Sequence, residues 1–539
     1  MLPFLSLLRS RLRRSGSSVR SSVRLSARSS APRPAWAPAW ALAGLFAVLY
    51  GCVAVNRHRR MLTQAYDLGI FEQAVRAYAH GEAPVVLLKG PGYHLLGDHF
   101  HPVLVTLAPF YRAFPGAVTL LVAQAVLMAL AVVPLTCWAY EVGGRRVALT
   151  VGVLTGASWG IVNAAADDFH EIAFAVPLLA FAATALGRGR PVAAALWALP
   201  LVLVKEDLGL TVAAFGVLIF RRAPRAGGGR ALGFGVALLG VAATALTVLV
   251  VLPSFNPDGG FDYWRQLGSG GTTTAPWAPV ARLGWPPLKW LLLFLLAATA
   301  GFLGLRSPLA LLCVPTLAWR LLADNPHYWG VGYHYSAVLM PLAVAALVDA
   351  LGRAGLPGRA DATAPEGARG GSGAPGAAEV PGPVEAPGGA ADAAEPGRVR
   401  RVRSARRALA VGALVAAVTF PAFPLHEVVM PEAWRTSPRL AQARAMLARI
   451  PDGATVAASN RLAAQLTGRA TVALVCREPA PASGAQAPTG PQWVAVDLTD
   501  PSVKAPCAVE DTRRMLGRYE REGYRPVVDG GGLLLLKRP

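Results

Sequence analysis

The chain alternates between long apolar runs and short polar segments. The runs 41–55, 120–137, 231–252 and 290–305 contain no charged residue. About 20 such residues cross the hydrocarbon core of a bilayer as a helix, and a soluble protein rarely needs many runs of this length. The pattern predicts an all-α polytopic membrane protein with about eleven transmembrane helices, followed by a small α/β domain.

Arginine positions predict how the helices are oriented. If the basic N-terminal tail (1–35) is cytoplasmic, each later turn on that side carries arginine, and the segments rich in histidine and acids fall on the opposite side. Cytoplasmic loops of membrane proteins are enriched in Lys and Arg. We therefore expect a multi-pass protein of the cell membrane with its C-terminal domain outside the cytoplasm. The predicted cytoplasmic turns are Glu141–Arg146, Arg188–Arg190, Arg221–Arg222 and Arg306.

Composition divides the remaining chain. A multi-helix core over 36–352 precedes a segment, 353–407, that is dominated by Gly, Ala, Pro and Glu near its middle. Such a segment buries too little apolar surface to fold, so we expect a disordered cytoplasmic linker. A last transmembrane helix over 408–425 then leads to an extracytoplasmic α/β domain, 426–539. Within this domain the pattern predicts helices at 439–450 and 513–522 and strands at 455–458, 493–497 and 533–536.

Charge and composition narrow the class of protein. Only 15% of residues are charged and 54% are hydrophobic, which leaves too little polar surface for a soluble globule. The net charge of +21 would suggest a nucleic-acid partner in a soluble protein. Here the arginines lie in short loops and tails, and no zinc-finger, RNA-binding or dinucleotide-binding motif accompanies them. The expected partner is the lipid bilayer, with no nucleic acid.

The five cysteines fall into two groups. Cys52, Cys137 and Cys313 lie in apolar runs, where cysteine acts as a small hydrophobic residue. Cys476 and Cys507 lie in the domain predicted outside the cytoplasm, where disulfides persist. The sequence leaves open whether these two pair.

A carboxylate follows directly on the first predicted span. Leu68, Phe71, Val75 and Tyr78 recur at helical spacing, which predicts a short amphipathic helix at the membrane surface with Asp67 at its start. Asp67 either caps this helix or serves as a general base or metal-binding carboxylate at the membrane boundary. The two roles are compatible.

Two further outer segments contain metal-ligand residue types. In 97–102, two histidines and an aspartate fall within four positions, although the spacing matches no standard site. In 167–171, helical continuation would place Asp167, His170 and Glu171 on one face. Each set either binds a ligand or is hydrated at headgroup level. The candidates are Asp98, His99, His101, Asp168, His170 and Glu171.

Two more polar segments lie near predicted outer turns. The tripeptide at 205–207 interrupts an apolar stretch, so its charges lie in a cavity or pair mutually. Lys205 either holds a phosphate or pairs with a carboxylate. Around Arg320 the aromatic residues either form an interfacial belt or, with the arginine, bind a lipid-linked phosphate. The candidates here are Lys205, Glu206, Asp207, Arg320, His327 and His334.

These motifs resemble two known groups. Tyr66-Asp67 followed by Glu72, and His101-Pro102 opening a later span, are similar to elements of GT-C glycosyltransferases. The strings Tyr-Asp-Leu-Gly-Ile-Phe-Glu-Gln and Gly-Asp-His-Phe-His-Pro, with Lys-Glu-Asp at 205–207, most resemble the bacterial domain-of-unknown-function 2079 family. The resemblance covers roughly residues 36–350. Leu68 departs from the mannosyltransferase-like branches, which carry a second acid there.

The GT-C resemblance implies a hexosyltransferase that moves a sugar from a polyprenyl phosphate to an envelope glycan, lipid or protein. Asp67 would be the catalytic base, and Lys205 or Arg320 would neutralise the leaving phosphate. The sugar pocket or a divalent ion, Mg or Mn, would use Asp98, His99, Asp168, His170 and Glu206. The full set of expected substrate-binding residues is Glu72, Asp98, His99, His101, Asp168, His170, Glu171, Lys205, Glu206, Asp207, Arg320, His327 and His334.

Two other classes remain open. A transporter or flippase predicts polar groups at mid-membrane depth and internally related halves. Neither feature is clear in the sequence. A non-enzymatic envelope protein predicts that no cavity joins Asp67, Asp168 and Lys205.

Overall fold

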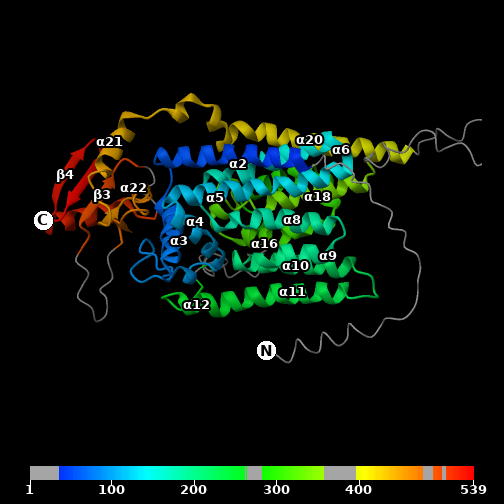
Figure 1. The fold of residues 1–539 in the computed structure, drawn as a ribbon, viewed down its shortest axis with the longest axis horizontal. Coiled ribbons are helices and arrows are strands. Elements are labelled where there is room, and N and C mark those ends of the chain that lie inside the picture. The colour runs from blue at the N-terminus through cyan, green and yellow to red at the C-terminus, as the bar shows by residue number, and fades with distance from the viewer. Residues whose placement is uncertain (1–35, 262, 264–281, 357–395, 478–489, 501–505) are drawn as a thin grey trace, which may run out of the picture. The chain divides into compact units, whose positions relative to one another are not determined.

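The computed structural model describes residues 36–261, 263, 282–356, 396–477, 490–500 and 506–539. The predicted N-terminal tail and most of the predicted linker, 357–395, lie outside the described residues. The described chain is mostly helical and ends in one five-stranded sheet (Figure 1). The helices that precede the C-terminal domain are α2 (Trp36–Arg59), α3 (Ile70–His80), α4 (Ala108–Ala113), α5 (Ala117–Leu130), α6 (Val132–Gly156), α7 (Trp159–Ala166), α8 (Ala175–Gly187), α9 (Pro191–Ala198), α10 (Leu208–Arg222), α11 (Gly229–Leu246), α12 (Leu252–Phe255), α15 (Leu288–Thr299), α16 (Val314–Leu322), α17 (Pro326–Trp329), α18 (Leu339–Arg353) and α20 (Pro396–Thr419).

Among the described residues, four helical stretches are long and apolar enough to cross a membrane, judged by length and composition. The candidate spans are Trp36–Arg59, Ala117–Gly156, Gly229–Phe255 and Val399–Ala422. Four shorter apolar helical stretches lie between them, from Glu171–Gly187 to Pro308–Leu322. These apolar helices identify the chain as a membrane protein. The number of about eleven spans stays a prediction.

Predicted cytoplasmic turns lie together at one end of the helices. α6 is broken at Gly143 and Gly144, and Gly144 has φ 73°, a conformation that glycine adopts without steric cost. Arg188, in the turn between α8 and α9, forms an ion pair with Glu141 at 2.7 Å. Arg222, at the end of α10, donates to the carbonyl oxygen of Leu186 at 2.9 Å. These contacts join three turns that the arginine pattern places on one side.

The centre of the helical part is α18. Every residue from Leu339 to Leu351 is buried, Asp349 included, and α6, α8 and α15 pack around the helix. Asp349 accepts a hydrogen bond from Ser307, and Arg353 forms an ion pair with it one turn later. A helix that is apolar on all sides needs such complete cover.

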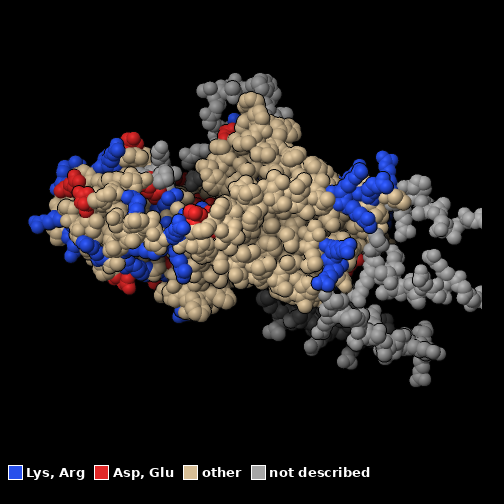
Figure 2. Space-filling model, turned by 90° about the horizontal axis from the view of Figure 1, so that it is seen from above, with Lys and Arg blue, Asp and Glu red and all other residues tan. Residues whose placement is uncertain are grey.

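The outer helices keep their apolar side chains exposed. On α2 these include Trp40 and Val48, and on the span Gly229–Phe255, which begins with α11, they include Phe234, Leu238 and Leu249. Exposed apolar surface of this extent fits contact with lipid better than with water. Figure 2 shows a largely uncharged surface on this part of the molecule, with Lys and Arg gathered where α20 begins.

α20 begins at Pro396, inside the segment predicted as linker, and ends at Thr419, before the predicted end of the last span at 425. Arginine is a strong helix former, so the basic stretch before 408 continues the helix. Pro421 and Pro424 follow the helix, and proline cannot continue a regular α-helix. The chain after α20 packs on the end of α2, where Asn56 Nδ2 donates to the carbonyl oxygen of Ala433 at 2.7 Å.

The C-terminal domain is a mixed sheet with strand order β2-β1-β3-β5-β4. Strands β2, β1 and β3 are parallel, and β5 pairs antiparallel with β3 and β4. The predicted helices and three predicted strands are confirmed as α21, α23, β1, β3 and β5. Strands β2 and β4 were not predicted; β4 contains Pro526, and proline is uncommon within strands. The bounds are α21 (Pro438–Leu447), β1 (Thr455–Ala458), α22 (Asn460–Ala463), β2 (Thr471–Leu474), β3 (Trp493–Asp497), α23 (Val509–Arg521), β4 (Arg525–Gly530) and β5 (Leu533–Lys537).

Helix α3 lies between the membrane helices and the C-terminal domain. Leu68, Phe71 and Val75 pack with residues 104–121 and Phe169, as one hydrophobic cluster. Ile70 and Ala74 share a second cluster with the C-terminal domain. The predicted helix is thus present as α3, covered on two sides by protein, and its place at the membrane surface stays a prediction.

Candidate functional site

A cavity of about 560 Å³ lies where α3, α10, α11 and α16 approach one another. It joins Asp67 and Lys205, which come from different parts of the chain. One wall is polar, and α11 supplies an apolar wall. Ten of the residues predicted from the sequence line this cavity, namely Asp67, Asp98, His99, His101, His170, Glu171, Lys205, Glu206, Asp207 and His334.

Asp67 lies in η1 (Ala65–Gly69), a single π-helical turn that leads directly into α3. The residue that caps α3 is Gly69, so Asp67 does not cap this helix. The side chain of Asp67 is 46% exposed, and its Oδ1 lies 3.7 Å from His170 Nε2. The turn is fixed from both sides, because Gln64 N donates to Asp168 Oδ1 and Tyr66 N donates to Asn460 Oδ1, each at 2.9 Å. The carboxylate is held at the cavity and remains accessible.

Asp98 and His99 are paired with neighbouring groups. Lys89 Nζ lies 2.9 Å from Asp98 Oδ2, and Tyr263 donates to Asp98 Oδ1 at 3.2 Å. His99 Nδ1 lies 2.7 Å from Glu206 Oε1. Burial raises the pKa of Asp98, but His99 and then Lys89 bring it below the ordinary value. This part of the wall forms a network in which each charge faces an opposite one.

The segment 205–207 precedes α10 and lies against the same cavity. Lys205 Nζ is 2.7 Å from Glu171 Oε1, so the predicted internal ion pair is present. Burial lowers the pKa of Lys205, but Glu171 and the two following carboxylates raise it above its ordinary value. Trp319 Nε1 donates to Asp207 Oδ2 at 2.9 Å, and burial raises the pKa of Asp207 to about 6.

His170 and His334 face each other across the cavity wall. Their ring centroids are 3.4 Å apart and the rings are stacked at 26°. His334 Nδ1 lies 3.1 Å from Asp167 Oδ2. Burial lowers the pKa of His334 to about 4. Burial also lowers the pKa of His170, but Asp67 and then Asp167 raise it to about 9, which reflects an excess of negative charge here.

Gln124 of α5 holds the turn that presents His170. Its Nε2 donates to the carbonyl oxygens of Ala164 and Asp168, at 2.9 and 2.7 Å, and its Oε1 accepts from His170 N at 2.9 Å. Asp168 has φ 50°, an uncommon backbone conformation for a residue other than glycine. A buried amide from another helix thus fixes an irregular turn.

Four predicted site residues do not line the cavity. Glu72 is buried between α3 and the C-terminal domain, where Tyr111 donates to its carboxylate at 3.0 Å. The carboxylate of Asp168 accepts the Gln64 hydrogen bond and so supports η1. Arg320 is fully buried and donates to carbonyl oxygens of the loop after α16. His327 packs edge-on against Tyr333 with ring centroids 4.7 Å apart.

Sequence reasoning missed several residues of the cavity wall. Lys89 is the most informative of them, because the chain has only five lysines among 52 basic residues, and two of the five, Lys89 and Lys205, line this cavity. Lysine in an arginine-rich sequence was therefore a usable signal. Other residues missed were the aromatic side chains Tyr66, Phe261, Tyr263, Trp319, Tyr328 and Tyr335.

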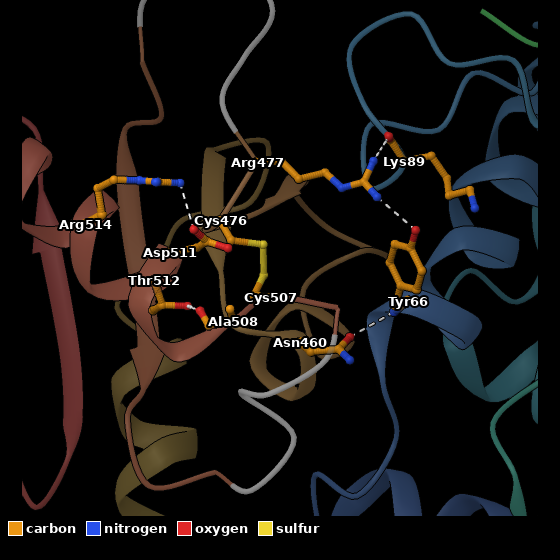
Figure 3. Close-up of a disulfide and its surroundings, with 10 residues drawn as sticks. All are labelled: Tyr66, Lys89, Asn460, Cys476, Arg477, Cys507, Ala508, Asp511, Thr512 and Arg514. Carbon is orange, nitrogen blue, oxygen red and sulfur yellow. Dashed lines mark hydrogen bonds and ion pairs between the residues drawn. A yellow bond between two sulfur atoms is a disulfide. The ribbon is translucent and has the colours of Figure 1, made fainter. Parts of the chain in front are cut away.

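The C-terminal domain reaches the edge of the cavity through Arg477 (Figure 3). Arg477 Nη2 donates to the hydroxyl of Tyr66 at 2.8 Å, and its Nη1 donates to the carbonyl oxygen of Lys89. The preceding residue, Cys476, forms a disulfide with Cys507, with a Cα–Cα distance of 5.5 Å. The disulfide that the sequence left open is thus present, and it ties the strand end that carries Arg477 to the start of α23.

The apolar wall connects the cavity with the outer surface of α11. Val241 and Ala245 of α11, with Val248 and Leu249 of the short π-helix that continues it (Thr247–Val251), line this wall, and the exposed fractions of Val241 and Leu249 are 50% and 65%. These side chains belong to a helix that is long and apolar enough to span a membrane. The cavity therefore borders surface that suits lipid, and its other end is rich in ionisable groups.

Fold and cavity together define a membrane protein with apolar spanning helices and an α/β domain packed at one end. The chain belongs to the DUF2079 family of predicted membrane proteins, whose family model matches residues 57–535. The match includes the η1 turn, the polar wall of the cavity and most of the C-terminal domain. A comparison with curated proteins gives no match.

Proposed function

We propose that the protein is a GT-C-type glycosyltransferase that moves a sugar from a polyprenyl phosphate to an extracytoplasmic acceptor. The observation that carries this proposal is the two-sided cavity, which has ionisable groups at one end and the exposed apolar face of α11 at the other. A polyprenyl-linked sugar has the same division between a polar head and a long hydrocarbon chain. Its lipid part would lie along α11 while the sugar phosphate reaches Asp67.

Asp67 is the catalytic base in this proposal. Its side chain is half-exposed to the cavity, whereas Glu171 and Glu206 are buried in ion pairs. The acceptor hydroxyl would lose its proton to Asp67 as its oxygen attacks the anomeric carbon, and the bond from that carbon to the phosphate oxygen would break with inversion. His170, 3.7 Å away, would keep the carboxylate oriented toward the cavity.

Lys205 is the cation that we assign to the leaving phosphate. It lines the cavity and its pairing with Glu171 fixes its position. A fixed cation stabilises charge that develops on a leaving oxygen. Arg320, the other residue implied by the GT-C resemblance, has all its described hydrogen bonds directed to the loop 328–336 and is fully buried. We therefore assign it no substrate contact.

The proposed orientation has the N-terminus in the cytoplasm, about eleven spans, and the C-terminal domain outside. The Cys476–Cys507 disulfide supports this side for the domain, because disulfides persist in oxidising compartments. The acceptor would be an envelope glycan, lipid or protein that approaches Asp67 from the side of this domain. Tyr66 and Arg477, where the domain meets the cavity, lie beside this approach.

The test compares Asp67→Asn with the wild-type protein in nanodiscs, using undecaprenyl-phosphate-linked radiolabelled mannose and, separately, glucose as donors. With water as the acceptor in place of the envelope molecule, we expect wild type to release the sugar from at least one donor and Asp67→Asn to do so at least about 100-fold more slowly, with donor binding kept. Asp258→Asn, an exposed aspartate of an outer loop, is the matched control and should retain activity. Full activity of Asp67→Asn would remove Asp67 from this role, and absence of both donor binding and release in the wild type would overturn the proposal.

A further inference from the structure

We propose that Asp167, His170 and His334 form a binding site for a divalent transition-metal ion of the zinc class. The proposal concerns the resting protein and does not depend on glycosyl transfer. Ligand atoms of the three side chains all lie within 4.8 Å of one another, and the two histidines line the cavity. Three side chains at such mutual distances can point to one ion without a change of backbone.

The ligands come from two segments that are far apart in the chain. Asp167 and His170 lie in the turn after α7, and His334 lies in the loop between α17 and α18. Gln124 fixes the first segment through three hydrogen bonds. Arg320 fixes the second through Tyr335 O and Ser336 Oγ, at 3.1 and 3.2 Å, on the residues next to His334. Outer contacts of this kind orient metal ligands in known sites.

An unsatisfied buried group points independently to a ligand. The residue His170 is 4% exposed, and within the described part of the chain neither ring nitrogen has a hydrogen-bond partner. A buried polar group without a partner is costly. An ion held between His170, His334 and Asp167 would supply that partner. Because both imidazoles would then bind the ion in their neutral form, the stacked rings would not repel each other as two positive charges.

The charge of the cavity also favours a cation. Its described lining contains five carboxylates, Asp67, Asp98, Glu171, Glu206 and Asp207, against two lysines, and Asp167 lies next to it. Burial of unbalanced carboxylates is unfavourable unless cations accompany them. The pairs Lys89–Asp98, His99–Glu206 and Lys205–Glu171 account for three of the five carboxylates. Of the other two, Asp207 accepts a hydrogen bond from Trp319, whereas Asp67, like Asp167, lies beside the two histidines.

The chemical types of the three ligands indicate which metal ion the site would prefer. Two imidazoles and one carboxylate suit zinc and similar transition metals, whereas Mg²⁺ prefers oxygen ligands. This differs from the Mg or Mn ion that the resemblance implies, and of the five residues named there it keeps only His170. Three protein ligands leave a fourth coordination position open, and the carboxylate of Asp67 lies 3.7 Å from His170 Nε2.

The experiment measures metal binding by the full-length protein purified in detergent, treated with chelator and titrated with ZnCl₂ by calorimetry. We expect one zinc per chain. His170→Gln and His334→Gln should each weaken binding at least about 100-fold, beyond the loss that follows removal of an outer-shell partner. His99→Gln is the matched control, because His99 is also a buried histidine of the cavity but is paired with Glu206, and it should keep zinc binding.

A second measurement uses the wild-type protein alone and so does not depend on the folding of a variant. Co²⁺ in place of zinc should give visible absorption bands of a four- or five-coordinate site, which zinc displaces and Mg²⁺ does not. The absence of these bands together with no zinc uptake would overturn the site. Undiminished zinc binding by both His170→Gln and His334→Gln, or its loss in His99→Gln alone, would also overturn it. Neither measurement uses a sugar donor. A negative result would therefore reject the metal site without bearing on the proposed transferase activity.

Discussion

At the scale of single residues, Asp67 and Glu72 show how position in the fold decides the role of a carboxylate. The two are five positions apart, and the GT-C resemblance includes both. Asp67 is half-exposed at the cavity, whereas Glu72 is 1% exposed and accepts hydrogen bonds from Tyr111 and Thr467. Burial raises the pKa of Glu72 to about 7, against 4.5 for an ordinary glutamate. Glu72 therefore has a structural role, because it joins α3 to the C-terminal domain.

This pKa gives a prediction for Glu72→Gln. Because the folded pKa is raised, the folded protein holds the proton more firmly than the unfolded chain, and stability falls as the pH rises from about 4.5 to about 7. The loss is on the order of 3 kcal/mol. Glutamine stays neutral, so Glu72→Gln should remove this part of the pH dependence and unfold at a higher temperature than wild type above pH 7.

The measurement is the thermal unfolding midpoint of the purified protein between pH 5 and pH 8. Glu82→Gln serves as the control, because Glu82 is an exposed carboxylate just after the same helix and should leave the pH profile unchanged. If Glu72→Gln kept the wild-type slope, the ionisation of Glu72 would not be coupled to folding.

At the scale of elements, Arg320 joins α16 to the loop that follows it. Its guanidinium donates to the carbonyl oxygens of Tyr328, Gly330 and Tyr335 and to the hydroxyl of Ser336. That loop carries cavity residues, His334 among them. An arginine near outer aromatic residues suggested a lipid phosphate as ligand, but its donors are used within the protein.

We predict that Arg320→Lys destabilises the protein. Lysine keeps the positive charge but cannot reach four acceptors with one ammonium group, and hydrogen bonds to a charged group are worth roughly 1.5–3 kcal/mol each, so a loss of at least about 3 kcal/mol is expected. Thermal unfolding and limited proteolysis of the loop measure it, with the exposed Arg306→Lys as control. An Arg320→Lys protein of unchanged stability that lost only phosphate-donor binding would return Arg320 to the role of substrate ligand.

At the scale of the whole molecule, the two ends of the helical part differ in chemistry. Arginine-bearing turns contact one another at one end, and the histidines and carboxylates of the cavity gather near the C-terminal domain. From the positive-inside rule we predict that the first end faces the cytoplasm.

This orientation predicts opposite labelling of two introduced cysteines. In right-side-out vesicles, Glu82→Cys should react with a membrane-impermeant maleimide, and Arg145→Cys should react only after permeabilisation. Both positions are exposed. The background is a protein in which Cys52, Cys137 and Cys313 are replaced by alanine and the Cys476–Cys507 disulfide is kept. The reverse labelling pattern would invert the topology.

The sequence by itself determined the features that depend on local pattern. Long apolar runs specified the membrane helices, arginines marked the turns, and short apolar runs located strands β1, β3 and β5. The ionisable residues near the outer turns of these helices were recognisable because charge is costly beside a membrane. Ten of them do line one cavity.

Only the tertiary structure decided which of these residues act together. His334 is within hydrogen-bond distance of Asp167, 167 positions away in the sequence, and Glu72 accepts a hydrogen bond from Thr467, 395 positions away. Periodicity within one segment carries no information on such contacts, since they depend on how distant elements pack. The same packing separates the accessible carboxylate of Asp67 from the buried one of Glu72, because burial and access are properties of the assembled surface.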